Sequence, residues 1–234
     1  MHTETLIIIP AYNEERSISG VVSSIKEKYR DIDVVVINDG SNDNTAELAG
    51  KAGAFVLSHV FNMGYGISIQ TGYKYAIYNN YKYLVQIDGD GQHDIKGIEI
   101  LLEKLKNGSA DIVLGSRFLK SNNYRLSIYR FMGIRFFQFF LRLLTGLKIS
   151  DPTTGFQAMN RKVLKIFAQD YFPYDYPDAD VIILLSKMNM KLEEVAVSMY
   201  PNQEGKSMHS SFLGVVYYIF KMLLSMFLTK YRRF

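Results

Sequence analysis

Two carboxylates one residue apart, Asp88 and Asp90, offer the clearest chemistry in the sequence. They stand in QIDGDGQHD, directly after the apolar run at 83–87. Carboxylate oxygens are ligands that Mg²⁺ and Mn²⁺ prefer, and the glycines on either side of Asp90 permit sharp backbone turns around such an ion. The pattern predicts a divalent cation with open positions for a diphosphate, although a solvated acidic turn has the same spacing.

Further polar side chains follow two other apolar runs. Asn13 and Glu14 follow LIII at 6–9, and Asp39 follows VVVI at 34–37. A lone acidic residue after a strand commonly caps a helix, and the Ser- and Asn-rich segment after Asp39 offers such caps. Three acidic loops at three strand ends are harder to explain by capping alone. Because ligands bind beyond the carboxyl ends of strands in open α/β sheets, we expect these loops to form one site.

The elements that must position these loops alternate between short β-branched runs and segments with helical spacing. This alternation predicts an α/β fold with a mostly parallel central sheet flanked by helices. Strands are expected at 6–9, 34–37, 54–58, 83–87, 110–116 and 191–200. Helices are expected from 18, from about 45, and at 66–78, 97–105 and 180–188. The segment 151–160 is expected to be a polar turn that leads back to the core.

Length and composition indicate one catalytic unit. The 234 residues are 48% hydrophobic, which is enough for one domain with a sizeable core and a terminal appendage. The absence of cysteine excludes disulfides, zinc–thiolate sites and thiol nucleophiles. The first 15 residues lack the regions of a signal peptide, so we expect the N-terminus in the cytosol. The net charge of +4 suits anionic lipid or phosphorylated substrates, and we expect no nucleic-acid partner.

Two segments of the C-terminal half, 125–142 and 211–229, mix basic side chains with aromatic and aliphatic ones. The second is close to the roughly 20 apolar residues of a membrane span, but Lys221 in its middle argues against a simple transmembrane helix. We therefore expect a catalytic domain at 1–209, an amphipathic helix at 210–234, and C-terminal helices that lie in the membrane interface, where the stretch 125–142 adds basic heads and aromatic anchors to the same surface. Packing on the core or in an oligomer interface is the alternative.

Taken together, the motifs resemble glycosyltransferase family 2. LIIIPAYNEE, VVVINDGSNDNT, QIDGDGQHD, LGSRF and DPTTGFQAMNR stand in the order that the family shows. The resemblance is to the branch that includes dolichyl-phosphate mannose synthase and bacterial polyprenyl-phosphate glycosyltransferases. It implies the GT-A fold, a nucleotide-sugar donor of the UDP or GDP type, and inversion at the anomeric carbon.

The resemblance also implies roles for individual residues. Mg²⁺ or Mn²⁺ is expected at Asp88 and Asp90. Arg117 and Arg130 are expected to bind an acceptor phosphate, and arginine forks suit that task. Asp90 and Asp151 are expected to be catalytic. The nucleotide sugar is expected to bind at Pro10, Ala11, Tyr12, Glu14, Asp39, Asp88, Gln92 and Lys206.

The acceptor decides whether the reaction needs a base. A phosphomonoester has a second pKa of about 6, so a phosphate acceptor is already anionic near neutral pH. A hydroxyl acceptor needs a carboxylate to take its proton, for which Asp151, Asp178 and Asp180 are the candidates. The resemblance favours Asp151, although a turn role before Pro152 explains that residue equally well.

Three positions depart from the family's pattern. Tyr65 in NMGYG and Asn202 in NQEGKS stand where relatives often carry Lys and Arg, which removes positive charge near the donor diphosphate. Ile134 stands where relatives often carry a phosphate-binding Ser, which weakens the lipid-phosphate assignment. His93 lies close enough in sequence to Asp90 to approach a metal, although a histidine with a structural partner is the commoner case.

The sequence therefore predicts a metal-dependent inverting glycosyltransferase that moves a sugar onto a polyprenyl phosphate. We expect it at the cytoplasmic face of the membrane, as a peripheral or monotopic protein and a possible homo-oligomer. One alternative is a family 2 transferase that acts on a saccharide hydroxyl in cell-surface polysaccharide synthesis. Another is a catalytically weak membrane-associated scaffold. A sugar nucleotidyltransferase is disfavoured, because PAYNEE is neither glycine-rich nor basic.

Overall fold

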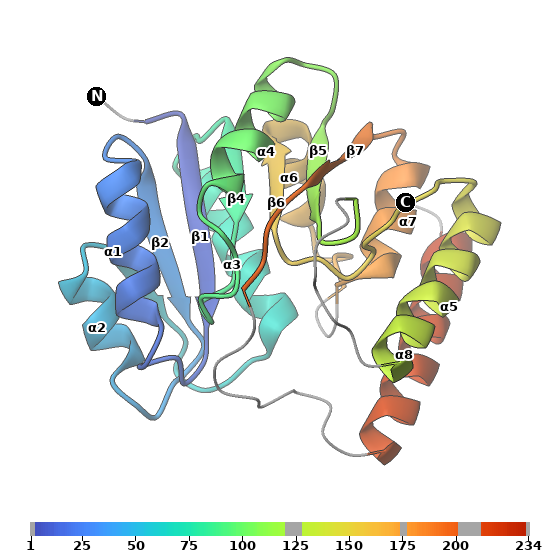
Figure 1. The fold of residues 1–234 in the computed structure, drawn as a ribbon, viewed down its shortest axis with the longest axis horizontal. Helices are drawn as coiled ribbons and strands as arrows, with labels where there is room; N and C mark the ends of the chain where they lie inside the picture. Colours follow the sequence, from blue (N-terminus) through green and yellow to red (C-terminus); the bar gives the residue numbers. More distant parts are fainter. Residues whose placement is uncertain (1–2, 120–127, 174–176, 201–211, 233–234) are drawn as a thin grey trace.

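The computed structural model describes residues 3–119, 128–173, 177–200 and 212–232, and the side chains of 128–132 and 212–218 lie outside that description. Within these residues the strands are β1 Thr5–Ala11, β2 Asp33–Asn38, β3 Phe55–Ser58, β4 Tyr83–Gln86, β5 Ile112–Ser116, β6 Gln157–Asn160 and β7 Leu192–Ala196. The helices are α1 Ile18–Lys28, α2 Thr45–Lys51, α3 Tyr65–Tyr78, α4 Gly97–Lys106, α5 Ile128–Thr145, α6 Arg161–Phe167, α7 Ala179–Lys187 and α8 Phe212–Tyr231 (Figure 1).

The strands form one seven-stranded sheet in the order β3-β2-β1-β4-β6-β5-β7. β6 is antiparallel to its neighbours β4 and β5, and the other neighbouring pairs are parallel. Every strand except β6 therefore ends at the same edge of the sheet, toward which the arrowheads of β1 and β2 point in Figure 1. The predicted α/β fold with a mostly parallel sheet is confirmed.

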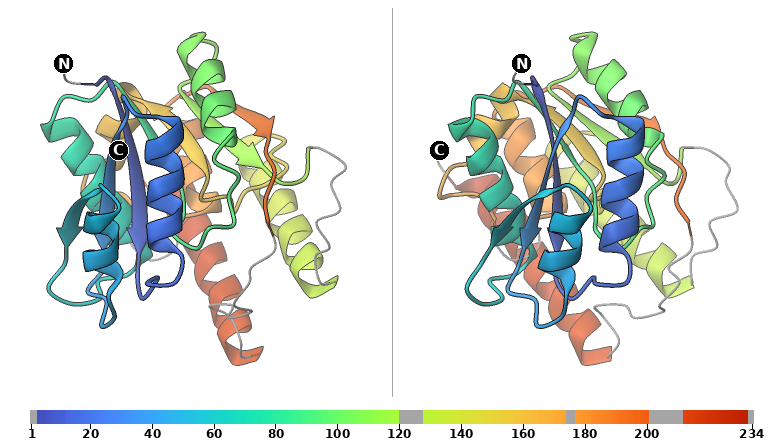
Figure 2. Two further views of the ribbon diagram at one scale, coloured as in Figure 1. Left: turned by 60° about the vertical axis from the view of Figure 1, so that its left-hand side comes forward. Right: turned by 90° about the vertical axis from the view of Figure 1, so that its left-hand side faces the viewer.

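Helices cover both faces of the sheet, as Figure 2 shows. Leu6 and Ile8 of β1 belong to a core cluster with residues of α3, α6 and α7. Ile7 and Ile9 belong to a second cluster with residues of α1 and α4. Successive side chains of a strand point to opposite faces, so a strand buried on both faces is apolar throughout. This is why the run LIII marks the strand in the sequence.

Two elements were not predicted. The segment 151–160 was expected to be a turn, which is wrong for 157–160 because these residues form β6 between β4 and β5. The run QAMN has no β-branched residue, so its strand conformation depends on its two neighbours rather than on local propensity. Helix α6 follows at once and is capped by Asn160, whose side chain accepts hydrogen bonds from the backbone N–H groups of Lys162 and Val163.

The described part of α8 packs on the body of the protein. Its Met222 and Met226 are 2% and 0% exposed and join the core cluster on the α7 side of the sheet. At its C-terminal end, Lys230 Nζ donates to the carbonyl oxygen of Leu144 in α5 at 2.6 Å. The segment 210–234, predicted to be an amphipathic appendage, thus contributes side chains to the core.

Helices α5 and α8 also expose large apolar side chains on their outer sides. Exposed side chains on the two helices are Phe136, Phe139, Leu143, Phe220, Leu224, Phe227, Leu228 and Tyr231. We call these eight residues the C-terminal apolar surface. Among the described residues, no helix combines the length and the hydropathy that crossing a membrane requires.

Candidate active site

The loops after β1 and β2 bind each other at the carboxyl edge of the sheet. The backbone N–H groups of Asn13 and Glu14 donate to the hydroxyl oxygens of Ser41 and Thr45 at 3.0 and 2.8 Å. Asp43 accepts from the next N–H of the first loop at 3.2 Å. The Ser41, Asp43 and Thr45 side chains, which lie in the segment expected to cap a helix, therefore also bind the loop after β1 to the loop after β2. Asn13 has a φ of 56°, a left-handed conformation that asparagine tolerates better than most residues.

Asp39 organises the loop that leads into α3. It is 3% exposed, and its carboxylate accepts hydrogen bonds from the N–H groups of Met63 and Gly64, both at 2.9 Å. Its Oδ1 also lies 2.7 Å from Nδ1 of His59. These partners bring the segment 59–64 against the end of β2. Asp39 thus lies at the predicted edge, and its position there shapes a neighbouring loop.

Asp88 follows β4 and has a partner on each carboxylate oxygen. Tyr65 Oη donates to Oδ1 at 3.1 Å, and Nε2 of His93 lies 3.0 Å from Oδ2. Burial raises the pKa of Asp88, but the hydrogen bonds from His93 and Tyr65 and the charge of Arg117 outweigh burial and leave this pKa below its usual value. Asp88 is therefore held as an anion in a fixed orientation.

The half-buried Tyr65 belongs to a chain of hydrogen bonds that includes the buried side chains of Gln86 and Tyr73. Gln86 Nε2 donates to Tyr65 Oη at 2.8 Å, and the hydroxyl of Tyr73 donates to Gln86 Oε1. Burial, together with the charge of Asp88, raises the pKa of the Tyr65 hydroxyl, so this group stays a neutral donor. Tyr65, at the position where the resemblance leads us to expect Lys, thus donates a hydrogen bond to Asp88 as a neutral group.

Asp90 lies in the same loop and is bound by Gln92. The backbone N–H of Gln92 donates to Asp90 Oδ1 at 3.0 Å, and its side-chain amide donates to Oδ2 at 2.5 Å. Burial and the negative charge of Asp88 raise the pKa of Asp90 above its usual value. A cation between the two carboxylates would relieve that repulsion.

The segment 151–156, which precedes β6, passes close to the carboxylate of Asp88. A Cβ atom on Gly155 would lie 2.7 and 2.9 Å from the two carboxylate oxygens of Asp88, and 2.9 Å from Tyr65 Oη. Thr154 Oγ1 donates to the carbonyl oxygen of Gly115 in β5 at 2.7 Å and so fixes the segment against the sheet. Only glycine fits between this segment and Asp88, which explains the glycine of DPTTGF.

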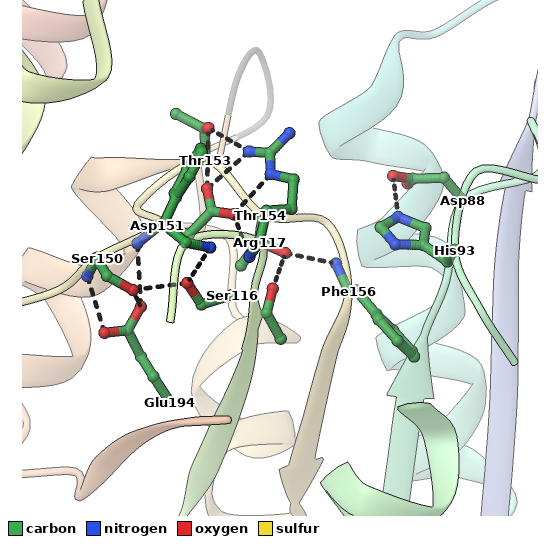
Figure 3. Close-up of polar contacts among 12 residues, drawn as sticks. Asp88, His93, Ser116, Arg117, Ser150, Asp151, Thr153, Thr154, Phe156 and Glu194 are labelled. Atoms are coloured by element: carbon green, nitrogen blue, oxygen red, sulfur yellow. Dashed lines mark hydrogen bonds and ion pairs between the residues drawn. The ribbon is translucent and has the colours of Figure 1, made fainter. Parts of the chain in front are cut away.

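Arg117 and Asp151 form a bidentate ion pair (Figure 3). Arg117 Nε and one terminal nitrogen each lie 2.6 Å from an oxygen of Asp151, whose side chain is 0% exposed. The same terminal nitrogen donates to Thr153 Oγ1 at 3.1 Å. The loop beneath the pair is held by Glu194 of β7, which accepts from the N–H groups of Ser150 and Asp151 at 2.8 and 3.0 Å. Asp151 is thus placed to orient Arg117.

Glu194 was not found from the sequence. It lies in the run LEEVA, where two neighbouring glutamates in a strand must point to opposite sides of the sheet. Because the two glutamates cannot both face the same side, the spacing marks the pair as unusual for a strand. It does not show that Glu194 binds the loop some 43 residues earlier.

Several predicted residues lie outside the described part of the chain or away from these contacts. Lys206 falls in the segment 201–211, which is not described, and Arg130 lies in the first turn of α5, where side chains are not described. Tyr12 is 44% exposed at the end of β1, beside the buried Ala11. Ile134 is half-buried within α5.

Asp180 is a buried carboxyl group in the first turn of α7. It is 1% exposed and accepts hydrogen bonds from the N–H groups of Val181 and Asp178 at 2.8 and 3.1 Å. Ser225 of α8 donates to its other oxygen. Burial, with a smaller effect from the charge of Asp178, raises the pKa of Asp180 to about 7. Its buried position removes Asp180 from the candidates for a base that contacts substrate.

The raised pKa of Asp180 predicts a pH dependence of stability. A carboxyl group that binds its proton more tightly in the folded chain stabilises the fold below its unfolded pKa, and this stabilisation is lost as pH rises toward its folded pKa. Asp180→Asn removes the titration. Between pH 5 and pH 7.5, the free energy of unfolding of the variant should therefore rise relative to wild type by about 2 kcal/mol.

Urea denaturation at the two pH values measures this difference. Asp170→Asn is the control, because that carboxylate is fully exposed and the variant should follow wild type at both pH values. An equal difference between Asp180→Asn and wild type at both pH values would show that Asp180 does not titrate in this range.

The carboxylates of Asp88 and Asp90 suit a hard divalent cation. Within the described ranges, no group of three or more His, Cys, Asp and Glu side chains is arranged to hold a metal ion. Mg²⁺ keeps several waters and is commonly bound by one or two carboxylates together with substrate phosphates. The carboxylate pair at the carboxyl edge of the sheet therefore fits a cation whose remaining coordination positions are filled by a diphosphate and by water.

Comparisons with known proteins agree with this geometry. One relative is the UDP-N-acetylglucosamine–dolichyl-phosphate N-acetylglucosaminyltransferase of Methanococcus voltae. It is 26% identical over 210 residues, which cover 82% of this chain and 83% of the relative. The undecaprenyl-phosphate mannosyltransferase of Micrococcus luteus is 28% identical over 222 residues, 90% of this chain and 88% of the relative.

A solved structure confirms the GT-A fold. The crystal structure of glucosyl-3-phosphoglycerate synthase from Mycobacterium tuberculosis with Mn²⁺, UDP and phosphoglyceric acid matches with a TM-score of 0.71 at 16% identity, over 97% of this chain and 78% of that chain. The model of the family described as glycosyl transferase family 2 matches residues 6–167. The chain belongs to glycosyltransferase family 2 and is a glycosyltransferase related to polyprenyl-phosphate sugar transferases.

Proposed function

We propose that this glycosyltransferase moves a sugar from a UDP or GDP donor onto the phosphate of a polyprenyl phosphate. The observation that carries the proposal is that one loop, which precedes β6, holds both the Asp151 carboxylate paired with Arg117 and Gly155, which packs against the carboxylate of Asp88. A guanidinium that suits a phosphate is thus linked through this loop to carboxylates that suit a metal and a diphosphate. The names of the two relatives support a lipid-phosphate acceptor.

The donor is proposed to bind over the loops at the carboxyl edge. Asp88 and Asp90 would hold Mg²⁺ or Mn²⁺, which as a Lewis acid offsets charge on the departing nucleoside diphosphate. Gln92 orients Asp90 through two hydrogen bonds. We assign the nucleoside to the loop of residues 10–14 and to the region shaped by Asp39. Lys206 is assigned to the diphosphate by resemblance alone.

The reaction needs one bond to form and one to break. An oxygen of the acceptor phosphate attacks the anomeric carbon, and the bond from that carbon to the donor's β-phosphate oxygen breaks, so the nucleoside diphosphate leaves. Attack from the face opposite the leaving group inverts the anomeric centre. The acceptor oxygen is already anionic near neutral pH, so no side chain has to remove a proton.

Asp151 is proposed to act through Arg117. Both of its oxygens already accept from that guanidinium, and it is fully buried. A carboxylate in this state is poorly placed to take a proton from a hydroxyl, whereas it fixes the direction in which Arg117 presents its charge. The fit to a phosphate acceptor is therefore better than the fit to a saccharide hydroxyl.

The C-terminal apolar surface is proposed to lie on the cytoplasmic face of a membrane, which makes the protein peripheral or monotopic. Apolar side chains such as Phe139 and Leu143 are 62% and 68% exposed and lie on one face of α5, four residues apart. Arg135 and Arg142 of the same helix supply charge that anionic lipid attracts. A lipid-linked acceptor would then meet the enzyme at the surface that holds it.

Donor binding should depend on a divalent cation through Asp90. In Asp90→Asn one carboxylate charge is lost, so Mn²⁺ should no longer strengthen the binding of the nucleoside diphosphate, and affinity in the presence of Mn²⁺ should fall at least about tenfold. Calorimetry with UDP and GDP, with and without Mn²⁺, measures this. Asp94→Asn, the same change four residues along, should bind as wild type does. Unchanged metal dependence in Asp90→Asn would contradict the assignment.

The acceptor can be identified with a matched pair of lipids. Wild-type protein is given labelled UDP- and GDP-sugars with either a polyprenyl phosphate or the corresponding polyprenol, and labelled lipid is counted. We expect product with the phosphate and none with the alcohol, because only the phosphate offers an anionic nucleophile and a ligand for Arg117. Product with a soluble saccharide and none with the lipid phosphate would favour the hydroxyl alternative, and no transfer to any acceptor would favour a scaffold.

Membrane contact should depend on the apolar side chains of α5. Phe139→Ser with Leu143→Ser removes two large apolar groups, and each buried group contributes about 1.5–3 kcal/mol. Sedimentation with anionic vesicles should therefore show binding that is at least about a hundredfold weaker. Phe55→Ser is the control, because Phe55 is 54% exposed on β3 at the opposite edge of the sheet. Equal binding of all variants would show that another surface meets the vesicle.

A further inference from the structure

Asp180 joins α8 to the first turn of α7. One carboxylate oxygen accepts from the hydroxyl of Ser225 in α8. The other accepts from the N–H groups of Asp178 and Val181, at 3.1 and 2.8 Å. The first N–H groups of a helix have no partner within the helix, so this side chain supplies one. The conformation at Asp178 is therefore tied to a residue of α8.

Asp178 lines a small cavity beside the candidate active site. The cavity has a volume of about 10 Å³, which is room for one water molecule, and its wall also includes Tyr65, Gly155 and Gln157. Tyr65 donates to Asp88, and Gly155 packs against the same carboxylate. Asp178 thus lines the same cavity as two residues that lie against Asp88.

Adhesion between α7 and α8 alone does not explain a carboxyl group at this position. Met222 and Met226 of α8 already pack into the core on this side. A buried carboxyl is costly, and an apolar pair of similar size would hold two helices together at least as well. What the carboxyl group adds is a hydrogen bond of fixed direction to the N–H of Asp178. This bond fixes the backbone at Asp178 and therefore the direction of the Asp178 side chain.

We propose that Asp180 and Ser225 are positioning residues that fix Asp178 in the wall of the cavity next to Asp88, so that the geometry of the donor site depends on α8. The contact makes the C-terminal helix part of the catalytic unit. The effect on catalysis rests on the proposed function, whereas the effect on the α7 turn does not.

Hydrogen exchange tests the structural step without any assay of activity. In full-length Ser225→Ala, exchange at the Asp178 and Val181 amides should rise about tenfold, because Asp180 loses the donor that orients it. Ser225→Thr restores a hydroxyl and should restore slow exchange. Thr229→Val, which removes a hydroxyl one turn further along α8, should leave both amides unchanged. Equal exchange in Ser225→Ala and wild type would overturn the proposal.

Steady-state kinetics test the functional step. Ser225→Ala should lower kcat/KM for the nucleotide sugar about tenfold, with recovery in Ser225→Thr and no change in Thr229→Val. In an Asp178→Ala background, Ser225→Ala should have no further effect, because the residue through which it acts is gone. Additive losses would overturn the proposal, and so would faster exchange without any kinetic change. A wild type with no activity on any donor would instead overturn the proposed function, while exchange still tests the contact.

Discussion

The ion pair between Arg117 and Asp151 is the interaction on which the arrangement of the site depends. A fully buried carboxylate costs several kcal/mol unless it is paired, and Asp151 meets this requirement only because Arg117 contacts both of its oxygens. Arg117 directly follows β5, whereas Asp151 opens the segment that leads into β6. The pair therefore joins two neighbouring antiparallel strands at the edge where the other strands end. The same segment then carries Gly155 to the carboxylate of Asp88.

Much of this arrangement could be predicted from the sequence, for physical reasons. A strand buried on both faces has to be apolar throughout, so runs such as those before Asp39 and Asp88 are visible without a structure. Parallel strands place their carboxyl ends at one edge, so the acidic residues after them were expected to meet. Both expectations follow from periodicity and sheet geometry, which are local or nearly local properties.

The contacts that orient the site could not be predicted in this way, because they join residues far apart in the chain. Glu194 holds a loop 43 residues earlier, and Ser225 reaches a carboxyl 45 residues earlier. The antiparallel strand β6 is four residues long and depends on its neighbours. Tyr65 was noted only as a missing positive charge, since its hydrogen bond to Asp88 exists only once α3 and β4 are packed.

Helix α8 shows why a boundary at residue 210 is difficult to draw from composition. Met222 and Met226 turn toward α7, whereas Phe220, Leu224 and Phe227 are exposed. With apolar side chains on both sides, the helix resembles a membrane segment in hydropathy, although its inner side belongs to the core. A lipid surface that binds the outer side, as proposed, would meet a helix whose inner side is fixed to α7. The distance from that surface to Arg117 would then be set by packing, which suits an acceptor whose phosphate remains at the lipid surface.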